Sequence, residues 1–156
     1  MRGITFFILA ILNISAIAQE NMPNNKFIRR SSSSASIEVR LDSLYLSALG
    51  NVISKCAFPD NQDSAMSCWG KFIENMDKTL KLNNFKWHSE PQLHIRSYFN
   101  ENGYIDYFAY SIKDTTFTRY DEFENALKEF VYNYNFGLKC DKKFAQCSSI
   151  KFGDNK

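Results

Sequence analysis

The sequence lacks the motifs by which most enzymes are recognised. It has only two histidines, His88 and His94, and no serine stands in a G-x-S-x-G turn, so no nucleophile with an adjacent base is visible. A phosphate-binding P-loop, a dinucleotide-type glycine fingerprint and a cluster with metal-ligand spacing are also missing. The neighbouring acids Asp121, Glu122 and Glu124 are explained as the polar start of a helix. We therefore expect no catalytic residue, no cofactor and no metal, unless the fold brings distant residues together.

An excess of either charge is missing too. The chain has 19 Lys and Arg against 17 Asp and Glu, a formal net charge of +2. This balance argues against a nucleic-acid partner and against a polybasic membrane binder. Hydrophobic residues make up 44% and charged residues 23%, which is too apolar for a disordered chain. A length of 156 residues is enough for one domain.

Only one long apolar run is present, and it lies at the N-terminus. Arg2 is followed by the apolar stretch from Ile4 to Ile14 and by the small-x-small site Ala16-Ile17-Ala18 before Gln19. This pattern predicts a secretory signal peptide over residues 1–18, because the run is short of the roughly 20 residues of a membrane span. The mature protein is then expected to be exported, periplasmic or secreted, with no stable membrane span. The alternative is an uncleaved N-terminal anchor.

The four cysteines include no C-x-x-C pair, so neither a zinc site nor a redox-active pair is favoured. An oxidising compartment makes disulfides the better interpretation. Four cysteines allow three connectivities, of which we favour the local one. We expect Cys56–Cys68 across a turn-like segment and Cys140–Cys147 across a short polar loop.

Periodicity divides the mature chain into a linker and one domain. Residues 19–36 are polar and serine-rich, which predicts a flexible linker before a single domain over residues 37–156. Apolar residues at helical spacing predict a helix over residues 41–53 and a second from about Asp63 to Leu80. The second helix carries an apolar stripe, namely Met66, Trp69, Phe72, Ile73, Met76 and Leu80.

Alternation then predicts two strands and a tight turn. Residues 92–99 alternate with one apolar face, and Asn102-Gly103 favours a hairpin turn into a strand over residues 104–112. The apolar phase changes between Ile105 and Phe108, which predicts a β-bulge. A third helix is expected from Thr118 towards Gly137, and a short strand over residues 148–152. The class is α+β: a small antiparallel sheet of a hairpin and a C-terminal strand, packed against helices, with an extra N-terminal helix.

Several segments in this order resemble the C-terminal domain of TonB proteins of the Bacteroidetes type. They are FPDNQDSAMSCWGKFIENM, LHIRSYFNENGYIDYFAYSI and FENALKEFVYNYNFGLKCDKKFAQCSSIKF, and together they cover about residues 56–153. The chain departs from the family where Asp60-Asn61 replaces a Gly-Gly pair. With the leader cleaved, it is also expected to lack the membrane anchor and the proline-rich spacer of the family's energy transducers.

The resemblance implies a non-enzymatic module that binds a protein or an extended peptide of the cell envelope by strand addition. The expected edge strand consists of Ser148, Ser149, Ile150, Lys151 and Phe152. Under the other interpretation of this segment, the loop between Cys140 and Cys147 merely protects the edge. One alternative function is a disulfide-stabilised secreted domain with a ligand or enzymatic site near Trp87, His88 and Glu90. Another is a minimal anchored energy transducer with a retained leader.

Overall fold

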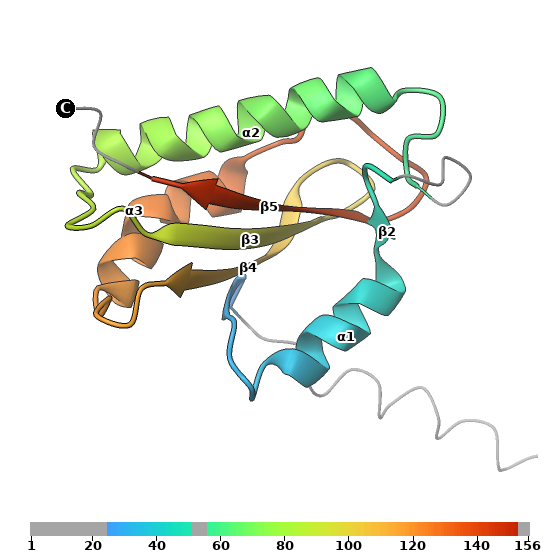
Figure 1. The fold of residues 1–156 in the computed structure, drawn as a ribbon. Coiled ribbons are helices and arrows are strands. Elements are labelled where there is room, and N and C mark those ends of the chain that lie inside the picture. The colour runs from blue at the N-terminus through green and yellow to red at the C-terminus, as the bar shows by residue number, and fades with distance from the viewer. Residues whose placement is uncertain (1–24, 51–55, 153–156) are drawn as a thin grey trace, which may run out of the picture.

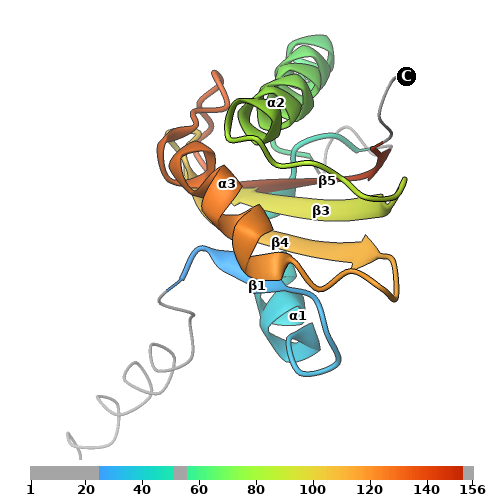
Figure 2. The same ribbon diagram turned by 90° about the vertical axis from the view of Figure 1, so that its left-hand side faces the viewer.

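The computed structural model describes residues 25–50 and 56–152 (Figure 1). In these residues a five-stranded mixed sheet has the strand order β1-β4-β3-β5-β2. Helices α2 and α3 cover one face of the sheet and α1 lies against the other (Figure 2). The elements in chain order are β1 (Phe27–Arg29), α1 (Ala35–Leu44), β2 (Leu46–Ser47), α2 (Gln62–Leu82), β3 (Gln92–Phe99), β4 (Ile105–Lys113), α3 (Tyr120–Asn133) and β5 (Phe144–Lys151).

The α+β class is confirmed, but the sheet is larger than the sequence predicted. Strand β3 pairs antiparallel with both β4 and β5, and the short strands β1 and β2 add in parallel to β4 and β5. Strand β1 falls in the segment 19–36 that was expected to be a flexible linker, and that expectation is wrong for the described part. Phe27 and Ile28 are buried there because they pair with Phe108 and Ala109 of β4.

The first predicted helix is also wrong in its bounds. Helix α1 runs over Ala35–Leu44 rather than residues 41–53, and the chain is extended from Tyr45 onward. Tyr45 leaves the helix because its ring packs edge-on against Tyr98 and its hydroxyl donates to Asp106 at 2.8 Å. Residues 51–53 of the predicted helix lie outside the described residues.

Helix α2 confirms the second predicted helix, with bounds Gln62–Leu82. Four members of its predicted stripe are buried against the sheet: Trp69, Phe72, Met76 and Leu80. Ile73 is partly buried. Met66 is 61% exposed, so its assignment to the core was wrong.

The β3–β4 hairpin confirms the predicted pair of strands and the predicted bulge. The register shifts between Tyr98 and Phe99, which pair with Tyr107 and Ile105 respectively. Gly103 in the connecting turn has φ +85°, and a Cβ there would lie 2.8 Å from the carbonyl oxygen of Leu138. Glycine is therefore required at this turn.

Helix α3 begins at Tyr120, two residues after the start expected at Thr118. Arg119 is the N-cap residue, and no side chain caps the helix. The buried face of α3 lies on the same side of the sheet as α2 and completes the main core. The opposite face of β3 is partly covered by α1, and Tyr98 is fully buried there in a second cluster.

Three buried tyrosines tie these layers together in the same way. Each tyrosine hydroxyl donates to a carboxylate at 2.7–2.8 Å, and that carboxylate also pairs with a cation. The three groups are Tyr45–Asp106–Lys143, Tyr98–Asp42–Arg96 and Tyr110–Glu124–Arg29. Burial first, and then the hydrogen bond to the carboxylate, raises the pKa of each tyrosine above its ordinary value.

Candidate partner-binding edge

Strand β5 lies near one edge of the sheet. It begins at Phe144, four residues before the predicted strand, and pairs with β3 along its whole length. On its other side, β2 reaches only Phe144 and Ala145. On this outer side, the second half of β5 therefore has no neighbouring strand among the described residues.

The hydrogen bonds to β2 show which backbone groups of β5 point away from β3. The Ala48 N–H donates to the Ala145 carbonyl oxygen at 2.8 Å. Because this direction alternates along a strand, the backbone groups of Cys147, Ser149 and Lys151 point the same way. We call the segment Ser149–Lys151 the open edge, since the outward groups of its two end residues have no partner among the described residues.

The side chain of Gln146 closes the edge at its N-terminal end. Its Oε1 accepts a hydrogen bond from the Leu49 N–H at 3.1 Å, and its Nε2 donates to the Cys147 carbonyl oxygen at 3.3 Å. At the other end, the Phe152 N–H donates to the Pro91 carbonyl oxygen at 3.3 Å, and its ring stacks on Trp87 with centroids 5.2 Å apart. The open edge is thus bounded at both of its ends.

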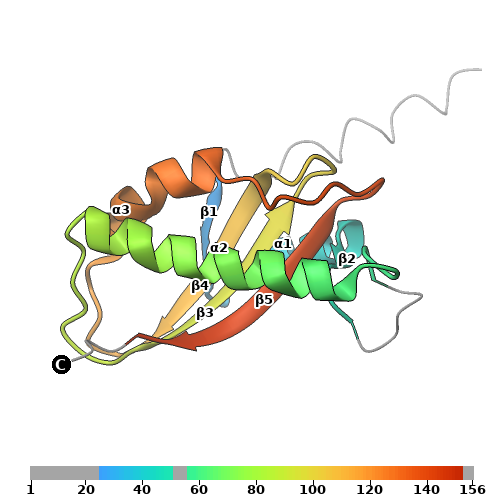
Figure 3. The ribbon, with the colours of Figure 1, turned by 90° about the horizontal axis from the view of Figure 1, so that it is seen from above.

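The two sides of the open edge differ in chemistry. Helix α2 crosses over β5 on one side (Figure 3), where Trp69 Nε1 donates to Ser148 Oγ at 2.7 Å. On the other side the side chains of Ser149 and Lys151 are exposed, and Ser149 Oγ lies 2.5 Å from His94 Nδ1. An extended chain added here would meet α2 on one side and polar residues on the other.

Four of the five predicted edge residues lie in β5: Ser148, Ser149, Ile150 and Lys151. Phe152 follows the strand and is buried as an anchor, so it offers nothing to a partner. Sequence reasoning missed Gln146 as the residue that closes the edge. Only its long-range contact with Leu49 gives it this role, and no local pattern signals that contact.

The Cys140–Cys147 disulfide predicted across the edge loop is not formed in this structure. Cys147 pairs with Arg96, whereas the Cys140 N–H donates to Glu101, which lies beyond the end of β3 at Phe99. The three residues from Arg96 to Phe99 already span about 10 Å. A disulfide requires Cα atoms about 4.4–6.8 Å apart, so this register keeps the thiols apart.

The Cys56–Cys68 disulfide is not formed either. Cys56 Sγ lies 3.1 Å from Gln62 Nε2 at the start of α2. Cys68 lies six residues after Gln62 in the helix, about 9 Å further along the helix axis. The thiol of Cys140 donates to the Ala57 carbonyl oxygen at 3.3 Å, and burial raises its pKa.

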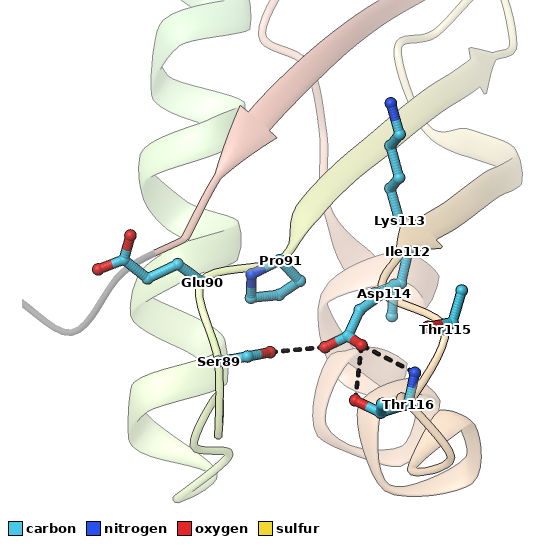
Figure 4. A pocket seen from close by; sticks show the side chains of 8 residues that line it. All are labelled: Ser89, Glu90, Pro91, Ile112, Lys113, Asp114, Thr115 and Thr116. Carbon is cyan, nitrogen blue, oxygen red and sulfur yellow. Dashed lines mark hydrogen bonds between the residues drawn. The ribbon is translucent and has the colours of Figure 1, made fainter.

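The residues of the alternative ligand site do not gather in one hollow. Glu90 lines an open hollow of about 640 Å³ at the ends of β3 and β4, but its carboxylate points away from Asp114 (Figure 4). Trp87 lines a different hollow beside the end of α2. His88 is exposed, and its Nε2 lies 2.9 Å from Arg119 Nη1. The structure therefore does not bring these three side chains together as a site.

The polar centre of the open hollow is Asp114. Its carboxylate accepts hydrogen bonds from Ser89 Oγ at 2.6 Å and from the backbone N–H and Oγ1 of Thr116 at 2.8 and 2.7 Å (Figure 4). These bonds lower the pKa of Asp114. They hold the loop after β4 against the loop before β3, which is a structural task.

Across residues 25–50 and 56–152, no group of three His, Cys, Asp or Glu side chains is placed to hold a metal ion. The helices in these two ranges are all too short or too polar to cross a membrane. The predicted signal peptide and its cleavage site lie outside the described residues. No known family model matches the chain, and neither curated proteins nor solved structures show significant similarity to it.

Proposed function

We propose that this chain is an exported, non-enzymatic interaction module of the TonB C-terminal kind. It binds an extended segment of a cell-envelope protein by adding that segment as a strand along β5. The observation that carries the proposal is the open edge, where the outward backbone groups of Ser149 and Lys151 have no partner among the described residues.

The order of elements supports the same proposal. The run α2–β3–β4–α3–β5 follows the helix–strand–turn–strand–helix–strand order on which the resemblance to TonB C-terminal domains rests. The two end residues of the open edge offer one N–H and one C=O each. Four backbone hydrogen bonds at about 0.5–1.5 kcal/mol net are worth about 2–6 kcal/mol in all. Since binding also costs lost freedom of motion, side-chain contacts must supply most of the affinity.

A proline substitution at the right position tests strand addition. The Ile150 backbone faces β3, so a proline there would disrupt the sheet itself. The Ser149 N–H points outward, so Ser149→Pro removes a donor from the open edge and leaves the β3 pairing in place. Ser149→Ala is the matched control, because it loses the same hydroxyl contact with His94 but keeps the N–H.

We expect Ser149→Pro to lose at least tenfold in affinity for a partner captured from envelope extract, and Ser149→Ala to keep it. NMR of the complex should show slowed hydrogen exchange at the amides of Ser149 and Lys151. Equal capture by both variants, with unchanged exchange at the two amides, would overturn the proposal. The melting temperature of each variant is also measured and should equal that of the parent chain, so that lost affinity does not reflect lost folding.

The anchored-transducer alternative differs only at the N-terminus. Sequencing of the exported protein decides between the two, because a mature chain that starts at Gln19 has lost the apolar run from Ile4 to Ile14. A chain that still starts at Met1 and sediments with membranes would favour the transducer.

A further inference from the structure

The face of the sheet opposite α2 is only half covered. Helix α1 packs over Ile28, Tyr98, Ala109 and Ala145, at one end of the strands. Towards the other end, cross-strand neighbours form two rows on the same face. We call these residues the basic face: Lys113, Gln92 and Lys151 in one row, and Ser111, His94 and Ser149 in the next.

The lysines of the basic face are not neutralised. Lys113 and Lys151 flank Gln92 from either side, about 10 Å apart at two strand spacings, and neither has a carboxylate partner among the described residues. By contrast, the cations beside α1 are paired, Arg96 with Asp42 and Arg30 with Glu38.

The nearest acids lie beyond the end of the first row. Asp114 keeps its negative charge, but its oxygens face Ser89 and Thr116 across the hollow after β4 (Figure 4). Glu90 is exposed and precedes the first row by two residues. The rows themselves contain no Asp or Glu, so an anionic group approaching beside Ser149 meets Lys151 first, with Lys113 two strands further on.

The α2 side of the open edge is apolar. Met66 and Ile73 lie seven residues apart on one flank of α2, and Met66 is 61% exposed. Trp69 donates to Ser148, and Asp77 and Leu80 share a hollow with Phe152, so the turn of α2 above the open edge is the one that contains Ile73. Met66 lies a turn before Trp69, beyond the N-terminal end of the open edge. Ile150 of β5 is partly buried on this same side of the sheet.

Successive side chains of an added strand point alternately to the two sides of the sheet. One set would therefore lie beside the basic face, and the other against Ile73 and Ile150. We infer that the segment that binds β5 alternates acidic and apolar residues. This inference rests on the proposed strand addition and names the chemistry of the partner.

Three labelled eight-residue peptides test the inference on the full chain by fluorescence anisotropy. The first alternates Asp with Val, the second alternates Lys with Val, and the third has the composition of the first with its acids and valines in separate blocks. We expect the first peptide to bind at least tenfold more tightly than either of the others. Its affinity should fall as salt rises, because the lysines are exposed.

Single lysine substitutions test which positive charges contact the acidic peptide. Lys151→Gln should weaken binding of the acidic peptide by about 1.5- to 5-fold, the range for exposed ion pairs. Lys113→Gln should weaken it less, because β4 lies three strand spacings, about 14 Å, from the added strand. Lys128→Gln, which removes an exposed lysine of α3 away from the edge, should leave it unchanged. All three substitutions lie on the surface, so the chain should keep its fold.

The outcomes separate the two claims. Equal binding of the acidic and basic peptides, both lost with Ser149→Pro, would overturn the acidic preference and leave strand addition standing. Equal binding of the alternating and block peptides would overturn the alternation. If Ser149→Pro changes none of the affinities, the proposed function fails, and this inference fails with it.

Discussion

The three tyrosine–carboxylate pairs predict a steep loss of stability at alkaline pH. Tyr98 and Tyr110 are completely buried and Tyr45 is 5% exposed, and the hydroxyl of each donates a hydrogen bond to a carboxylate. Burial and these hydrogen bonds raise the pKa of each hydroxyl well above the ordinary value of about 10. In the folded state the three groups keep their protons as the pH passes 10, whereas in the unfolded chain they release them.

The sign and size of the effect follow from this difference in bound protons. Below pH 10 both states hold the protons, so this stabilisation is fully present. Above pH 10 each tyrosine removes about 1.4 kcal/mol per pH unit, and the three together about 4 kcal/mol per pH unit. At pH 11.5 the loss is about 6 kcal/mol. That equals the whole stability of many domains, which are stable by about 5–15 kcal/mol.

Urea unfolding between pH 8 and pH 11.5 measures the slope. Tyr110→Phe should lower stability at neutral pH by about 1.5–3 kcal/mol, because a hydrogen bond to a charged group is lost. It should also reduce the alkaline slope by about one third. Tyr104→Phe is the control, since Tyr104 is 47% exposed, and it should change neither. A parent chain whose stability stays flat to pH 11.5, or a Tyr110→Phe variant with the full slope, would refute the reasoning.

Three further predictions concern the fold. Gly103→Ala should lower the free energy of unfolding by about 1–3 kcal/mol, because the residue has φ +85° and its Cβ would lie against the Leu138 carbonyl; chemical denaturation measures it. Ile28→Ala should cost about 2–5 kcal/mol, whereas Val39→Ala, at a position 71% exposed, should cost less than about 0.5 kcal/mol. A reductant should leave the melting temperature unchanged, since no disulfide joins the four cysteines; a clear fall would show that oxidised pairs form in solution.

The elements that the sequence predicted correctly are those with a long local pattern. Helix α2 carries its apolar stripe through about four turns, and the β3–β4 hairpin combines alternation with an Asn-Gly turn. Even the bulge was visible, because the apolar phase changes between Ile105 and Phe108. These features depend on residues close together in the chain.

The elements that were missed depend on distant contacts. Strands β1 and β2 have three and two residues, too few to show a period. Phe27 is held by Phe108, far along the chain, and Tyr45 leaves the expected helix for Asp106. The apolar spacing around Tyr45 also suited a longer helix, and no local signal separated the two outcomes. The predicted strand over residues 148–152 overlaps β5, which begins four residues earlier at Phe144, and the role of Gln146 at the end of the edge was not found.

Under the proposed strand addition, the lysines beside the open edge favour a partner segment over a second copy of the chain. An unpaired strand invites pairing with itself, and charged residues at the edge oppose this. If two copies paired through β5, the unneutralised lysines Lys113 and Lys151 of both would share one face of the joined sheet. Like charges on one face of the joined sheet disfavour such a dimer, whereas the carboxylates of a partner strand would be attracted to the same lysines. Under the proposed strand addition, the charges that oppose pairing with a second copy are thus also those that favour an acidic segment.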